Sequence, residues 1–136
     1  MSSKVILVIG LSGSGKTTLA TELSDRLKAY HLNADVIRKQ YDDWDFSKEG
    51  RIRQATRLKG LASESDNEYV VIDFICPLKE GRDIIDADYV IWMDTVTSSK
   101  YKDTDNVFEK PSESVAHKVQ NLTYNVDNVI LEIQGV

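Results

Sequence analysis

The sequence is poor in the residues that form disulfides and metal clusters. Its 136 residues include one cysteine, Cys76, and two histidines, His31 and His117. A lone cysteine cannot form an intramolecular disulfide, and this set is too small for a Cys/His metal cluster. Such cysteine usage is typical of a reducing compartment, so we expect a cytoplasmic protein.

Long apolar runs and an excess of positive charge are also missing. The apolar stretch near the start, residues 5–9, is much shorter than the ~20 residues that span a bilayer, and glycines rather than a cleavage site follow it. We therefore expect no membrane span and no secretory signal. Seventeen Lys and Arg against 22 Asp and Glu give a net charge of −5, which argues against a protein that holds nucleic acid by bulk charge.

The apolar pattern predicts one folded domain, residues 1–136, in which strands alternate with helices. An unbroken apolar run at residues 5–9 predicts a strand buried on both faces, as in a parallel sheet, and residues 69–75 and 89–93 predict two more buried strands. Helical spacing of apolar residues predicts three helices between or beside them: from Lys16 to residues 27–30, from an N-cap at Ser47 to residue 62, and around residues 78–85. This alternation is typical of a three-layer α/β fold.

The segment after Asp94 has the weakest pattern. It predicts a helix over residues 114–122 and a final strand over residues 129–133. No arginine occurs after Arg82, so this segment brings only lysines as cations.

A glycine-rich phosphate loop gives the strongest functional signal. Residues 10–17 match G-x-x-x-x-G-K-[ST] at every fixed position. Glycines let the backbone N–H groups curl around phosphate oxygens, and the following helix directs its N-terminal dipole at the same anion. Lys16 is expected to reach the β and γ phosphates and to serve catalysis, and the Thr17 hydroxyl to ligate Mg²⁺. We therefore expect ATP and Mg²⁺ as cofactors, with the loop contributing Gly10, Ser12, Gly13, Ser14, Gly15, Lys16 and Thr17.

The loop alone does not choose among kinases, GTPases and ATPases. The N-K-x-D motif that reads guanine is absent from the sequence, and motor-type ATPases are usually larger. The length fits a small-molecule kinase best. The sequence thus predicts a P-loop NTPase fold of the nucleotide kinase kind.

Arg51 suggests a second anion site. On a helical wheel it falls within the apolar stripe of its helix, whereas Arg53 and Arg57 lie on the other side. A cation in the first helical turn also opposes the helix dipole, so something must compensate it. Two interpretations remain open: a salt bridge to the aspartates at positions 42, 43 and 45, or an anionic substrate across the strand ends. Arg53 and Arg57 are either part of that site or solvated charges.

Carboxylates occur near strand ends at Asp35, Asp73 and Asp94. A phosphoryl transferase needs a carboxylate that holds Mg²⁺ water or accepts the proton of the acceptor hydroxyl. Asp73 ends a Walker-B-like run, residues 70–73, while Asp94 has the alternative role of a turn cap.

With these residues the chain resembles the adenylylsulfate (APS) kinases, P-loop enzymes that phosphorylate the 3′-hydroxyl of adenosine 5′-phosphosulfate. The matching pieces occur in family order between residues 5 and 94: residues 10–18, residues 33–35 with Arg38, residues 43–47 with Arg51 and Arg57, and residues 74–77 with Lys79 and Arg82. A weaker match at Thr104, Asp105, Phe108, Glu109 and Pro111 is similar to the loop near the substrate.

The resemblance implies roles for individual residues. Thr18 joins the ATP-binding loop, and Asp35 becomes the catalytic carboxylate linked to Mg²⁺, beside Thr17 as a metal ligand. Phe46 would stack on the adenine of APS. The other substrate-binding residues implied are Arg38, Arg51, Ile75 and Lys79.

The chain departs from the family pattern at four places. Asn33 begins an Asn-Ala-Asp where the family has Asp-Gly-Asp, Gln54 replaces an asparagine, and Cys76 replaces a serine. The segment after Asp94 is short and lacks arginine, although nucleotide kinases normally place a lid with phosphate-binding arginines there. Lys100 and Lys102 are candidate substitutes, with solvated charges as the alternative.

These observations predict an ATP-dependent phosphotransferase that converts APS to PAPS, a short form with a reduced or missing lid. The expected partner is a small anionic, APS-like substrate, with no membrane and no nucleic acid, and a homodimer is left open. Two alternatives remain. One is a kinase for another nucleoside or polynucleotide hydroxyl, and the other is a nucleotide-binding module with little turnover.

Overall fold

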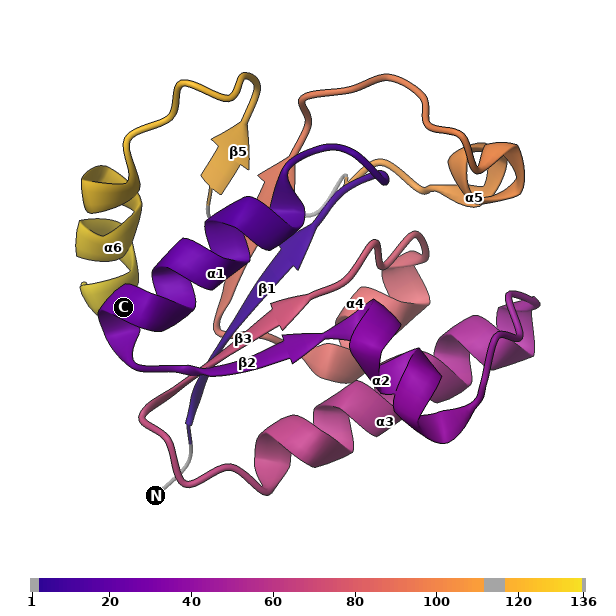
Figure 1. Ribbon diagram of the computed structural model, residues 1–136, viewed down its shortest axis with the longest axis horizontal. Helices are drawn as coiled ribbons and strands as arrows, with labels where there is room; N and C mark the ends of the chain where they lie inside the picture. The colour runs from indigo at the N-terminus through magenta and orange to yellow at the C-terminus, as the bar shows by residue number, and fades with distance from the viewer. Residues whose placement is uncertain (1–2, 112–116, 136) are drawn as a thin grey trace.

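A computed structural model describes residues 3–111 and 117–135, in which five parallel strands form one sheet between helices (Figure 1). The strands are β1 (Lys4–Ile9), β2 (Tyr30–Asn33), β3 (Tyr69–Asp73), β4 (Tyr89–Met93) and β5 (His117–Val119). Their order is β2-β3-β1-β4-β5, and every neighbouring pair is parallel. The predicted strand at residues 5–9 is therefore the middle of the sheet, as its unbroken apolar run requires.

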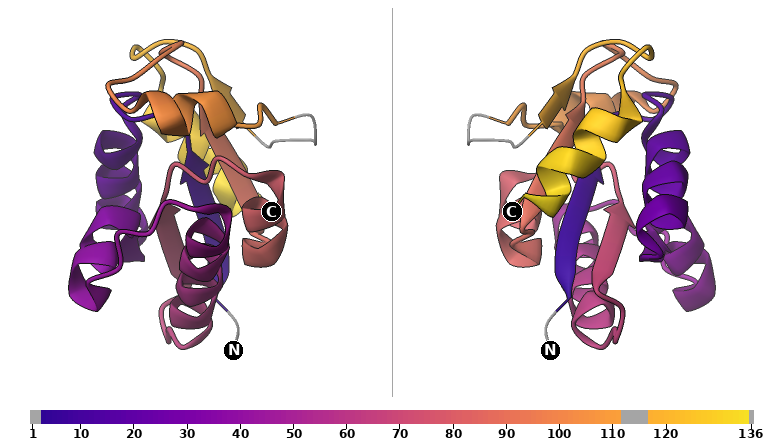
Figure 2. Two further views of the ribbon diagram at one scale, coloured as in Figure 1. Left: turned by 90° about the vertical axis from the view of Figure 1, so that its right-hand side faces the viewer. Right: turned by 90° about the vertical axis from the view of Figure 1, so that its left-hand side faces the viewer.

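Helices cover both faces of the sheet (Figure 2). One face carries α1 (Lys16–Leu27) and α6 (Val126–Gln134), and the other carries α2 (Ala34–Tyr41), α3 (Lys48–Ser63) and α4 (Lys79–Ile85). The remaining described helix, α5 (Lys102–Val107), lies beyond the carboxyl ends of the strands. The predicted three-layer α/β fold is confirmed.

Two apolar clusters explain why residues 5–9 of β1 are all apolar. Leu7 and Ile9 pack on the α2, α3 and α4 side, while Ile6 and Val8 pack on the α1 and α6 side. All four side chains are at most 1% exposed. At roughly 1.5–3 kcal/mol for burying each such side chain, β1 anchors the layers on both sides.

Both predictions for the C-terminal segment are wrong. Residues 114–116 of the expected helix lie outside the described residues, and the part that follows forms β5. The expected strand at 129–133 is helical, because Val126, Val129, Ile130 and Ile133 recur at helical spacing and pack on the core. Asn125 caps this helix, since its side chain accepts a hydrogen bond from the Asn128 N–H.

The sequence also left β2 and α2 unassigned, and these elements matter most for the site. Asn33 ends β2 and is the N-cap of α2, so strand and helix follow each other with no loop between them. The predicted strand over residues 69–75 ends at Asp73, which frees residues 74 and 75 to line a cleft. In the described part of the chain, no helix is long and apolar enough to cross a bilayer.

Candidate active site

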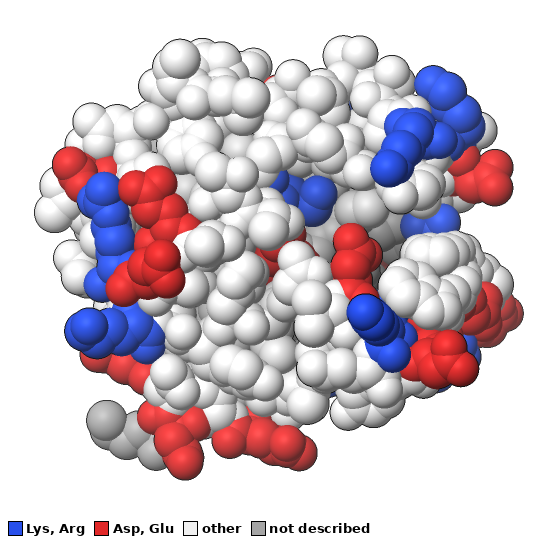
Figure 3. Space-filling model, viewed as in Figure 1, with Lys and Arg blue, Asp and Glu red and all other residues white. Residues whose placement is uncertain are grey.

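A cleft of about 1050 Å³ lies at the carboxyl ends of the strands, where parallel α/β sheets generally bind ligands. Figure 3 shows it as a hollow with basic side chains inside and acidic side chains at its edge. Its lining comes from four places: the phosphate loop and the start of α1, the β2–α2 junction with the following loop and the start of α3, the end of β3 with the segment after it, and the segment around α5.

The phosphate loop at residues 10–17 has the backbone that its glycines predict. Gly10, Gly13 and Gly15 have φ angles of 148°, 83° and 92°, a region that side chains rarely adopt. A Cβ at Gly10 would also lie 2.7 Å from the Met93 carbonyl oxygen. The loop therefore needs glycine both for its curl and for its approach to β4.

The loop and the start of α1 fit a phosphate group. No acidic residue lies in the first turn of α1, and its N-cap Gly15 has no side chain to cap the helix, so free N–H groups point outward there. The Ser14 hydroxyl is buried with no hydrogen-bond partner. Lys16 is 9% exposed and donates to the Leu11 carbonyl oxygen at 3.0 Å; burial lowers its pKa, and Asp73 and Asp35 partly offset this.

Asp73 is the buried carboxylate of the site. It ends β3, and its side chain is 2% exposed. Burial opposes ionisation, but the neighbouring side chains of His31 and Thr17, the nearby charge of Lys16 and a hydrogen bond from Asn33 together hold the pKa of Asp73 below its usual value. Asp73 is therefore an anion beside the predicted Mg²⁺ ligand Thr17.

Asp35 occupies a different position from Asp73. It lies exposed in the first turn of α2 and lines the cleft. An open carboxylate of this kind can meet an acceptor hydroxyl directly, whereas Asp73 is buried beside Thr17 and Lys16. In the described residues, no three His, Cys, Asp or Glu side chains cluster as a preformed metal site.

Two buried arginines and an aromatic ring form the other half of the cleft. Arg38 and Arg51 are 3% and 8% exposed, and their guanidinium carbons lie 4.4 and 5.7 Å from the centre of the Phe46 ring. Arg51 donates from Nε to the Phe46 carbonyl oxygen (2.8 Å) and from Nη2 to Thr104 Oγ1 (3.3 Å). Burial lowers the pKa of both arginines. The cleft therefore presents desolvated cations next to an exposed aromatic face.

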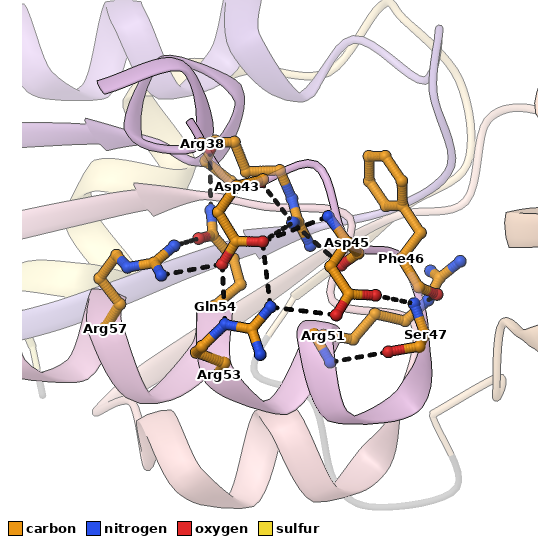
Figure 4. Close-up of polar contacts among 11 residues, drawn as sticks. Arg38, Asp43, Asp45, Phe46, Ser47, Arg51, Arg53, Gln54 and Arg57 are labelled. Atoms are coloured by element: carbon orange, nitrogen blue, oxygen red, sulfur yellow. Dashed lines mark hydrogen bonds and ion pairs between the residues drawn. The ribbon is translucent and has the colours of Figure 1, made fainter. Parts of the chain in front are cut away.

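Of the two interpretations of Arg51, the salt bridge to the aspartates at positions 42, 43 and 45 does not form. Arg53 and Arg57 bind Asp43 instead, at 2.8 and 2.9 Å, and Arg53 also reaches Asp45 at 3.1 Å (Figure 4). Among the described residues, no carboxylate lies within ion-pair distance of Arg51. Of the two open interpretations, the geometry favours the anion site, and it gives Arg53 and Arg57 a structural role in holding the loop before α3.

The segment around α5 forms one wall of the cleft. Four of its residues line the cleft: Lys100, Tyr101, Lys102 and Thr104. Because the two lysines are exposed, they lie at the rim of the cleft. The Thr95 hydroxyl ties this segment to the phosphate loop by donating to the Ser14 carbonyl oxygen at 2.7 Å. Of the residues that are similar to the family's substrate loop, Thr104 lines the cleft, and the candidate lid substitutes Lys100 and Lys102 line it as well.

Several predicted site residues do not reach the lining. Lys79 is outside it, and its ammonium pairs with Asp83 one turn along α4 at 2.9 Å. Gly10 and Ser14 shape the phosphate loop from beneath. The cleft does contain these other predicted site residues: Ser12, Gly13, Gly15, Lys16, Thr17, Thr18, Asp35, Arg38, Phe46, Arg51 and Ile75.

Sequence reasoning missed two aromatic residues of the site. Trp44 and Tyr101 line the cleft and are each half exposed. Trp44 lies within the matched motif at residues 43–47, so the motif match itself was an available signal. Tyr101 lies in the weakly patterned region after Asp94, where no comparable motif points to it.

Comparison with known proteins supports the cleft as a nucleotide site. A family described as "AAA domain" matches residues 5–83, which include the phosphate loop, both candidate carboxylates and both buried arginines. The chain belongs to this AAA domain family. The family match spans β1 through α4 and stops before the α5 segment.

The chain is similar to APS kinases, as its motifs predicted. It is 30% identical over 92 residues to the probable adenylyl-sulfate kinase of Aeropyrum pernix, covering 60% of this chain and 49% of the relative. It is 38% identical over 88 residues to the adenylyl-sulfate kinase of Penicillium chrysogenum, covering 57% and 41%. The chain thus spans about half or less of the length of these relatives.

Solved structures show the same fold. The Mycobacterium tuberculosis APS kinase CysC in complex with AMPPNP and APS superposes with a TM-score of 0.77 at 20% identity, covering 99% of both chains. Shikimate kinase from Aquifex aeolicus superposes with a TM-score of 0.68 at 19% identity and 96% coverage of both chains. At these identities the likeness shows the P-loop kinase fold alone.

Proposed function

We propose that this protein is an ATP-dependent kinase of the APS kinase type, which transfers the γ-phosphoryl group of ATP to the 3′-hydroxyl of adenosine 5′-phosphosulfate. One observation carries the proposal: a single cleft joins a phosphate loop to two buried arginines beside the Phe46 ring. The similarity to named adenylyl-sulfate kinases supports APS as the acceptor. The proposal includes a cytoplasmic location, consistent with the single cysteine.

Different residues of the cleft bind ATP and the acceptor. The backbone of residues 10–17 and Lys16 hold the β and γ phosphates, where a fixed cation offsets the charge of the transferred group. Arg38 and Arg51 hold the anionic end of the acceptor, and Phe46 stacks on its ring. Because these cations are desolvated and bound mainly to neutral oxygens, a substrate anion gains strong charge-assisted hydrogen bonds from them.

Mg²⁺ fits the carboxylate side of the site. Bound with ATP, Mg²⁺ would neutralise the negative charge that develops on the transferred phosphoryl group. Thr17 would supply its hydroxyl, with Asp73 behind it, and such sites take few protein ligands because phosphates and water complete the coordination. Asp35, open to the cleft, would orient the acceptor hydroxyl and accept its proton.

A coupled assay of ADP release across an acceptor panel tests the proposal. The panel contains APS, nucleosides, a 5′-hydroxyl oligonucleotide, shikimate and gluconate, with Lys16→Ala as the inactive control. We expect ADP release that depends on APS and on Mg²⁺. Release with another acceptor alone would assign a different kinase, and nucleotide binding without acceptor-dependent release would assign a binding module.

A further inference from the structure

Asn33 makes two contacts that no other side chain of the cleft combines. Its Oδ1 accepts a hydrogen bond from the Val36 N–H at 3.1 Å and so caps α2. Its Nδ2 donates to Asp73 Oδ2 at 2.8 Å. The sheet register accounts for this, because Asn33 and Asp73 are partners at the last position of the β2–β3 ladder. One amide therefore joins the end of β3 to the start of α2.

These two ends carry the two candidate carboxylates of the site. Asp35 lies two residues after Asn33 in the first turn of α2, and Asp73 is the buried anion beside Thr17 and Lys16. Asn33 thus sets the position of both carboxylates relative to each other. Two side chains of β2 approach the same oxygen, Asp73 Oδ2. Asn33 donates a hydrogen bond to it, and His31 Nε2 lies 3.7 Å from it.

An amide is suited to this position because it accepts at one end and donates at the other. An aspartate in its place could still cap the helix, but it would set a second carboxylate against Asp73. A serine would keep the cap and lose the reach to Asp73. The asparagine where APS kinases carry aspartate therefore has a specific consequence here, since it holds Asp73 without adding a third negative charge.

Gln54 supports the same turn from a second side. It is fully buried, and its Nε2 donates to the Ala34 carbonyl oxygen at 2.9 Å. Its Oε1 accepts from Arg57 at 2.8 Å, which connects α2 to the arginine network of α3. The first turn of α2 is thus fixed by the side chains of Asn33 and Gln54, both of which depart from the family pattern.

We propose that Asn33 is a positioning residue for phosphoryl transfer, which holds Asp73 beside Thr17 and fixes Asp35 relative to it through one side chain. This inference rests on the proposed kinase function. Its effect is exerted through Asp73 and Asp35 and not by contact with substrate.

The test compares Asn33→Ser with Asn125→Ser. Both variants replace an asparagine that caps a helix by a serine that can cap it, but only Asn33 also contacts a carboxylate of the cleft. Calorimetry measures ATP affinity with and without Mg²⁺, and kinetics give kcat and KM with the acceptor. A thermal melt of each variant reports whether capping is preserved.

We expect Asn33→Ser to lower kcat at least about tenfold with little change in acceptor KM, because carboxylate placement matters in the transition state. It should also reduce the gain in ATP affinity caused by Mg²⁺, whereas Asn125→Ser matches the parent in both measurements and both variants melt close to the parent. If the two variants match in kcat and in the Mg²⁺ effect, Asn33 is only a helix cap and the inference fails. If the parent itself shows no Mg²⁺-dependent ATP binding, the proposed kinase function is wrong, and the inference about Asn33 is wrong as well.

Discussion

Replacing Arg51 separates substrate binding from structural support. Arg51 makes two hydrogen bonds, to the Phe46 carbonyl oxygen and the Thr104 hydroxyl, and no described carboxylate pairs with it. A hydrogen bond involving a charged group contributes roughly 1.5–3 kcal/mol. If Arg51 holds the acceptor anion, Arg51→Ala should raise acceptor KM roughly 10- to 150-fold at ~1.4 kcal/mol per factor of ten, with ATP affinity unchanged.

The stability change should be smaller than for a broken ion pair. Both partners of Arg51 are neutral, and removing a cation from the start of α3 relieves its opposition to the helix dipole. We therefore expect a loss of about 1–2 kcal/mol in the free energy of unfolding, against ~3–5 kcal/mol when one member of a buried ion pair is removed. Denaturant unfolding with and without APS measures this difference.

Arg53→Ala is the matched control, because Arg53 lies on the same helix and binds Asp43 and Asp45 outside the cleft. It should raise acceptor KM far less than Arg51→Ala does, because Arg57 still binds Asp43 and holds the loop before α3. An Arg51→Ala protein with unchanged acceptor KM would refute the assignment of Arg51 to an anion site. A large loss of stability accompanying that result would make Arg51 a structural residue.

Three further substitutions test the rest of the cleft. Lys16→Ala should abolish measurable ATP binding in calorimetry without lowering the melting temperature, since its ammonium bonds only one backbone carbonyl oxygen. Asp35→Asn should lower kcat by about 10²–10⁴-fold with nearly unchanged ATP affinity, whereas Asp73→Asn should mainly weaken the Mg²⁺ dependence of ATP binding. If Asp73→Asn instead lowers kcat more than Asp35→Asn does in steady-state kinetics, the two carboxylates exchange roles. Asp43→Asn should raise acceptor KM but leave ATP affinity alone, because Arg53 and Arg57 lose the carboxylate that fixes the loop carrying Phe46.

The parts of the fold predicted from sequence are those where local pattern and burial agree. The central strand, the helix from Lys16 and the Ser47-capped helix combine continuous or periodic apolar residues with an end signal, and all three are confirmed. The β2–α2 junction was not predicted from the sequence because β2 has four residues, of which only Leu32 is fully buried. Its placement depends on pairing with β3, which is a contact distant in sequence.

The C-terminal errors have a different cause. Apolar residues recur at helical spacing over residues 126–133 and form α6, whereas the sequence analysis predicts a strand over residues 129–133. In the site, the motif segments predicted which residues meet, including Arg38, Phe46 and Arg51, which share the cleft. The contact of Asn33 with Asp73 could not be predicted, since it requires the register of two strands that the sequence does not pair.

The most direct test of the account follows the phosphoryl group itself. ATP labelled in its γ-phosphate is incubated with the protein, Mg²⁺ and APS, and the products are separated and the position of the label determined. The account predicts label on the 3′-oxygen of APS, with ADP formed in equal amount and no transfer by the Lys16→Ala protein. Label released only as inorganic phosphate, or retained in ATP that the protein binds, would contradict it.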